Sequence, residues 1–110
     1  MSTTIHQKLV RDGIPAIILA NGDSSVVDVL SHEDFIEALF AKMAEELAEL
    51  RAAGPDGQLA ELADVHETFA ALTLALGHSE AAVRSAASAK FFAVGGFKNR
   101  IWLESTTQPS

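Results

Sequence analysis

Two acidic pairs on either side of a Gly-Pro-Asp-Gly break constrain the fold of this chain more than any other feature. Glu46 and Glu49 precede the break, and Glu61 and Asp64 follow it, each pair with a spacing of three residues. Residues at this spacing lie on the same face of a helix. The break at residues 54–57 ends one helix and turns the chain back, so the pattern predicts an antiparallel helix hairpin whose two acidic pairs face each other.

The periodicity of the first helix of this hairpin, expected over residues 31–53, tests whether its carboxylates face solvent. Its apolar stripe consists of Phe35, Ile36, Leu39, Phe40, Met43, Leu47 and Leu50. Glu46 falls inside this stripe, and Glu49 and then Glu45 follow on one flank. A fully solvated acidic face would not place Glu46 there.

The second helix of the hairpin is expected over residues 58–76, with Gly77 at its end. Glu61 lies at the edge of its apolar stripe and Asp64 one step beyond. Like charges in a packed core repel each other and lose hydration unless a cation lies between them. Oxygen ligands suit a hard cation such as Mg²⁺. Periodicity alone leaves two interpretations open: a divalent-metal site that handles phosphates, or solvated helix faces with one misplaced glutamate.

Composition limits the other function classes. The chain has 110 residues, of which 48% are hydrophobic, and we expect one domain over residues 1–104 with a disordered tail at 105–110. The net charge of −7 argues against binding to nucleic acid or to an anionic membrane. No apolar run is long enough for a membrane span, no signal peptide is visible, and no cysteine is present. We therefore expect a soluble cytoplasmic protein.

Three further helix signals accompany the hairpin. Asp12 is placed to cap a short helix over residues 14–20 that Asn21-Gly22 ends. Ser31 is placed to cap the first long helix, and a third long helix is expected over residues 80–94. His66 lies on the apolar side of its helix and is predicted to be a core or interface histidine. The absence of a Glu-x-x-His motif weighs against a redox metal.

Two segments favour extended structure. Residues 26–30 form a β-branched run, and residues 97–104 alternate enough to pair with it. The predicted fold class is therefore mainly α, a helical bundle built around an antiparallel hairpin and completed by oligomerisation, with one small two-stranded β element as an optional addition.

Taken together, the motifs resemble a known superfamily. E-E-x-x-E at residues 45–49 followed by E-x-x-D at residues 61–64 resembles the MazG-like all-α nucleoside triphosphate pyrophosphohydrolases. K-L-V-R-D-x-I-P at residues 8–15 and G-G-F-x-x-R-I at residues 95–101 look like the branch described as phosphoribosyl-ATP pyrophosphohydrolase-like or house-cleaning. The resemblance covers residues 8–104. Val94 departs from the pattern, because an arginine often stands before the glycine pair.

The resemblance implies a site and a reaction. Its metal ligands would be Glu46, Glu49, Glu61 and Asp64, binding Mg²⁺ or alternatively Mn²⁺. Glu45 would belong to the shell of a second metal or position the attacking water, so the catalytic assignments are Glu45 and Glu46. The reaction would cleave a nucleoside triphosphate between the α- and β-phosphates. The candidates for binding the triphosphate are Lys8, Arg11, Lys90 and Arg100. For each of them, a solvated surface charge is the alternative interpretation.

Three functional hypotheses follow. The first is a Mg²⁺-dependent pyrophosphohydrolase of noncanonical nucleotides, working as a homodimer or larger homo-oligomer because a single hairpin leaves apolar faces exposed. The second is the phosphoribosyl-ATP pyrophosphohydrolase of histidine synthesis. The third is a non-catalytic helical module that binds a nucleotide or a partner protein.

Overall fold

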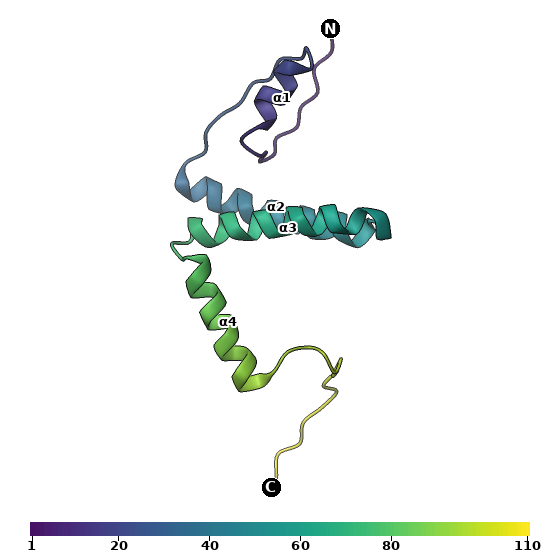
Figure 1. Ribbon diagram of the computed structural model, residues 1–110, viewed down its shortest axis with the longest axis vertical. Helices are drawn as coiled ribbons and strands as arrows, with labels where there is room; N and C mark the ends of the chain where they lie inside the picture. Colours follow the sequence, from purple (N-terminus) through teal and green to yellow (C-terminus); the bar gives the residue numbers. More distant parts are fainter. The chain divides into compact units, whose positions relative to one another are not determined.

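The computed structural model describes residues 1–110 and is all-helical (Figure 1). Its helices are α1 (Ile14–Ala20), α2 (His32–Ala52), α3 (Pro55–Ala75) and α4 (Glu80–Val94). The prediction of a mainly α fold is confirmed. The chain forms two compact units, Met1–Glu80 and Ala81–Ser110. No helix is both long and apolar enough to cross a membrane.

The start of α2 follows from its capping residue. The hydroxyl of Ser31 accepts a hydrogen bond from the backbone N–H of Asp34 at 3.2 Å, which confirms Ser31 as the N-cap. Glu33 and Asp34 place negative charge in the first turn, where its interaction with the positive end of the helix dipole stabilises the helix. The helix then continues to Ala52, one residue short of the predicted end.

The break between the two long helices is shorter than predicted. Only Ala53 and Gly54 adopt extended backbone, and α3 begins at Pro55 instead of Gln58. Proline suits the first turn of a helix because its missing N–H has no partner there in any case. The C-terminal end lies close to the prediction, since Gly77 follows α3 with φ of +87°, a conformation that glycine adopts without strain.

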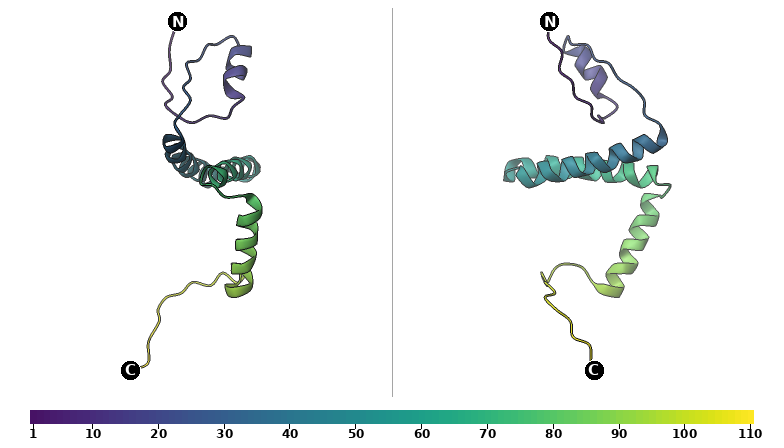
Figure 2. Two further views of the ribbon diagram at one scale, coloured as in Figure 1. Left: turned by 90° about the vertical axis from the view of Figure 1, so that its left-hand side faces the viewer. Right: turned by 180° about the vertical axis from the view of Figure 1, so that it is seen from behind.

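Helices α2 and α3 lie side by side and antiparallel, as Figures 1 and 2 show. The predicted hairpin is therefore confirmed. Its hydrophobic core is thin, because Leu39 and Leu72 are its buried apolar side chains. Thr68 and Thr73 are also buried, and their hydroxyls donate to the carbonyl oxygens one turn earlier at 2.9 Å.

The predicted cap of α1 is wrong, and a core position for His66 is excluded. Asp12 does not cap α1: the N-cap is Gly13, and no side chain caps the helix. His66 is exposed, because a hairpin of two helices covers only part of the apolar side of its wheel. Its alternative assignment as an interface residue stays a prediction.

The predicted two-stranded β element is also wrong. Residues 26–30 have no regular structure, and the side chains of Val26 and Val29 are almost fully exposed. Residues 97–104 form no strand either. A β-branched run needs a partner strand for its backbone hydrogen bonds, and two isolated strands are marginally stable in water.

The second unit contains nearly all of α4 and the segment that follows it. The helix ends as predicted, with Gly95 at φ of +84°. Near its C-terminus, Phe91 and Phe92 contact each other edge to face, with ring centroids 6.2 Å apart. Residues 105–110 have no regular structure, and their disorder stays a prediction, as does a single domain over residues 1–104.

Candidate metal centre

Three carboxylates from the hairpin meet between α2 and α3. Glu46 of α2 and Glu61 and Asp64 of α3 each place one oxygen within 4.8 Å of the oxygens of the other two. Glu46 is only 4% exposed, and the other two are partly buried. The helix periodicity that put Glu46 inside the apolar stripe thus predicted its burial correctly. We refer to these three residues as the acidic cluster.

Two oxygens of the acidic cluster lack partners. Glu46 Oε2 and Glu61 Oε2 are buried and accept no hydrogen bond. A buried polar group without a partner costs about 1–3 kcal/mol, and more when it is charged. A hard cation bound between these oxygens would relieve both the missing contacts and the mutual repulsion. The residues present therefore fit a divalent cation.

Glu45 and Glu49 flank the acidic cluster on α2. Glu45 is partly buried, whereas Glu49 is exposed. The negative charge of Glu46 raises the pKa of Glu49, and partial desolvation, Glu61 and Glu45 add to the effect. Glu49 is therefore close enough to the acidic cluster to feel its negative charge, although it is not one of the three residues of the cluster.

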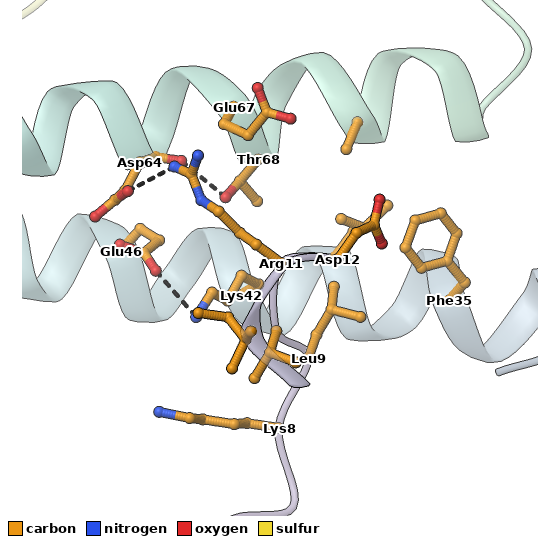
Figure 3. A pocket seen from close by; sticks show the side chains of 14 residues that line it. Lys8, Leu9, Arg11, Asp12, Phe35, Lys42, Glu46, Asp64, Glu67 and Thr68 are labelled. Atoms are coloured by element: carbon orange, nitrogen blue, oxygen red, sulfur yellow. Dashed lines mark hydrogen bonds and ion pairs between the residues drawn. The ribbon is translucent and has the colours of Figure 1, made fainter. Parts of the chain in front are cut away.

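Two cations lie against the acidic cluster (Figure 3). Arg11 Nη2 donates to Asp64 Oδ1 at 2.6 Å, and Lys42 Nζ lies 3.1 Å from Glu46 Oε1. Burial by itself lowers the pKa of Lys42, but the hydrogen bond to Glu46 and the charges of the nearby glutamates outweigh it and raise this pKa above its ordinary value. Positive charge thus reaches the cluster from both the N-terminal segment and α2.

A cavity of about 430 Å³ opens beside the acidic cluster. The N-terminal segment, residues 8–14, forms one wall, and α2 and α3 form the others (Figure 3). Its lining residues are Lys8, Leu9, Val10, Arg11, Asp12, Ile14, Phe35, Leu39, Lys42, Glu46, Asp64, Glu67, Thr68 and Ala71. The volume lies within the range of small-molecule sites, which combine an apolar lining with a few polar groups.

The structure brings most of the sequence-predicted site residues to this place. Glu46 and Asp64 line the cavity together with Lys8 and Arg11, whereas Glu61, Glu45 and Glu49 lie outside its lining. Lys90 and Arg100 belong to the second unit, and their assignment as phosphate contacts stays a prediction.

Sequence reasoning missed several cavity residues. The most important is Lys42, which pairs with Glu46 at the i, i+4 spacing of one helix face. That spacing was visible in the sequence and would have found it. Thr68 reaches the cavity only because the hairpin and the N-terminal segment fold around it, and no local pattern indicated this.

Comparisons with known proteins add little. No family model matches the chain, and no solved structure matches it. An uncharacterized protein of Mycolicibacterium smegmatis is 52% identical to it over 46 residues, which are 42% of this chain and 47% of that protein. The chain thus spans about half the length of this curated relative, whose name assigns no activity.

Proposed function

We propose that this chain is a Mg²⁺-dependent nucleoside triphosphate pyrophosphohydrolase that yields a nucleoside monophosphate and pyrophosphate. The observation that carries the proposal is the pair of unpartnered buried oxygens of Glu46 and Glu61, next to Asp64 and at the side of a cavity with cationic walls. Buried oxygen ligands of this kind suit Mg²⁺, with Mn²⁺ as the alternative ion.

Each group of the site has a part in this reaction. Glu46, Glu61 and Asp64 would hold the ion, with Glu49 as a further ligand on the exposed side. Carboxylate-bound Mg²⁺ supplies neutralisation of charge on the phosphate oxygens and a bound water of lowered pKa. Lys8 and Arg11 are placed on the cavity wall to bind the anionic chain of phosphates, Arg11 with the option of bidentate contacts.

The chemical step needs a water and a base. The water oxygen forms a bond to one phosphorus of the α–β bridge, and the bond from that phosphorus to the bridging oxygen breaks. The bridging oxygen leaves with the electron pair, and Glu45 accepts a proton from the water. Glu45 suits this role because it is one residue from Glu46 and only partly buried, so that its carboxylate remains accessible.

We further propose that the protein works as a homodimer in the cytoplasm on noncanonical or surplus nucleotides. One apolar face of the hairpin supports association. Its members, each about half exposed, are Phe40, Leu47, Leu62, Phe69 and Leu76. A second copy of the hairpin would cover this face and thicken the core. Light scattering coupled to size-exclusion chromatography tests this, and a monomeric mass at micromolar concentration would contradict it.

Pyrophosphate release over a panel of canonical and modified nucleoside triphosphates, with Mg²⁺ and with EDTA, tests the activity. We expect metal-dependent release from one or a few nucleotides and its loss in Glu46→Gln. The matched control is Glu37→Gln, which removes an exposed carboxylate of the same helix. Undiminished turnover in Glu46→Gln would refute the metal assignment. If no nucleotide releases pyrophosphate, phosphoribosyl-ATP is the next substrate to assay, and failure there would favour a binding module.

A further inference from the structure

Lys42 occupies a position that the reaction outlined above does not use. Its Nζ lies 3.1 Å from Glu46 Oε1 and 3.8 Å from Glu45 Oε1. The side chain is 20% exposed and lines the cavity. Figure 3 shows its ammonium group joined to Glu46 by a dashed line. Lys42 thus contacts both a predicted metal ligand and the space in which a ligand would bind.

A purely structural role explains this position poorly. Pairs at i, i+4 stabilise a helix only slightly, and the order with lysine before glutamate is the weaker of the two. The partner, moreover, is the most buried carboxylate of the site and keeps its second oxygen unpartnered. Lys42 therefore neutralises part of the charge of Glu46, but the remaining negative charge of the acidic cluster is not balanced by it.

A divalent ion and Lys42 compete for the same carboxylate. Two cations at Glu46 repel each other, so an ion that is ligated by Glu46 and Glu61 weakens the contact between Lys42 and Glu46. The lysine stem is flexible and its ammonium group is a compact charge with three donors. Because the stem is anchored on the cavity wall, the released ammonium group remains in the cavity. An anion bound next to the ion is then its nearest partner of opposite charge.

We propose that Lys42 is a phosphate-binding residue of this site, exchanging Glu46 for a phosphate oxygen of the pyrophosphate moiety when a divalent ion binds. This inference rests on the proposed function, because it takes the acidic cluster to be the metal site. It assigns two distinct effects to one side chain. Lys42 opposes binding of the ion alone, and it favours binding of phosphate to the protein that carries the ion.

Two binding measurements on Lys42→Met test this exchange without knowledge of the nucleotide. Binding of Mn²⁺ alone is followed by electron paramagnetic resonance, and binding of inorganic pyrophosphate to the Mn²⁺-saturated protein by isothermal titration calorimetry. We expect Lys42→Met to bind Mn²⁺ about tenfold more tightly than the original protein, because a competing charge is removed. We expect it to bind pyrophosphate at least about tenfold more weakly, because a charge-assisted hydrogen bond is lost.

Two variants serve as controls. Lys98→Met removes the same charge from an exposed position in the second unit and should change neither affinity. Lys42→Arg keeps a cation on the cavity wall and should restore most of the pyrophosphate affinity. Far-UV circular dichroism establishes that each variant is folded.

The outcomes separate this inference from the proposed function. Opposite changes of the two affinities in Lys42→Met support the exchange. Unchanged affinities, or a parallel loss of both, refute it while the metal site stands. If the original protein binds no Mn²⁺, the proposed function fails and this inference fails with it.

Discussion

Replacing Glu46 by glutamine should stabilise the protein in EDTA and abolish its stabilisation by Mg²⁺. The oxygens of the acidic cluster lie within 4.8 Å of one another, and at this outer limit and an effective dielectric constant of 20 one pair of carboxylates repels by about 3.5 kcal/mol. Glu46 has two such neighbours, Glu61 and Asp64, which together oppose its charge by about 7 kcal/mol. Lys42 at 3.1 Å offsets about 5 kcal/mol of this repulsion.

Two further terms favour the glutamine. The neutral amide avoids the desolvation cost of a buried carboxylate, and its oxygen can still accept a hydrogen bond from Lys42. Its NH₂ group can donate to the unpartnered oxygen of Glu61. We therefore expect the free energy of unfolding in EDTA to rise by about 2 kcal/mol in Glu46→Gln.

Urea unfolding followed by circular dichroism at a fixed protein concentration measures both effects. The original protein should gain about 2.7 kcal/mol when Mg²⁺ is present at a hundred times its dissociation constant. Glu46→Gln should gain nothing at the same concentration, and Glu37→Gln should behave like the original protein throughout. A loss of stability in EDTA for Glu46→Gln would refute the reasoning, since it would mean that the ion pair with Lys42 outweighs the repulsion within the acidic cluster.

Three further predictions use the same unfolding assay. The charge of Glu46 raises the pKa of Glu49 in the folded chain. The protein in EDTA should therefore lose stability as the pH rises from about 4.5, the ordinary pKa of a glutamate, through the raised pKa of Glu49. A rise in stability over this pH range would contradict the assignment. Arg11→Met should lower the free energy of unfolding by less than about 1 kcal/mol, because the side chains of Arg11 and Asp64 are 56% and 41% exposed. A loss above about 2 kcal/mol would show that this ion pair stabilises the fold substantially. Gly57→Ala should stabilise α3 by about 0.5–1 kcal/mol, since an added Cβ meets only the Cβ of Ala53 at 3.6 Å; destabilisation would mean that the break needs glycine there.

Local sequence signals predicted the hairpin well because they depend on neighbouring residues. Ser31 begins α2 through a hydrogen bond within its own first turn, and Gly77 ends α3 through its backbone conformation. The burial of Glu46 followed from its place in the apolar stripe of a single helix. In each case the deciding interaction spans only a few residues of the chain.

The failures share a different cause. Residues 26–30 have the composition of a strand but form none, because strand formation requires a partner that the sequence cannot guarantee. Asp12 is of a residue type that favours the N-cap position, yet it lines the cavity, and the N-cap of α1 is Gly13. Both segments lie outside the hairpin, where local propensity is weak and contacts with other elements decide the conformation.

The sequence by itself determined the two long helices, their break and the acidic residues that face each other across it, because helix periodicity and capping are local properties. Only the tertiary structure decided how the acidic cluster is surrounded. The pairing of Arg11 with Asp64 joins residues that are 53 positions apart, and the cavity forms only when the N-terminal segment lies against both helices. Whether Glu46 Oε2 and Glu61 Oε2 find a hydrogen-bond partner likewise depends on the residues that pack near them. These residues come from distant parts of the chain, and no local pattern predicts them.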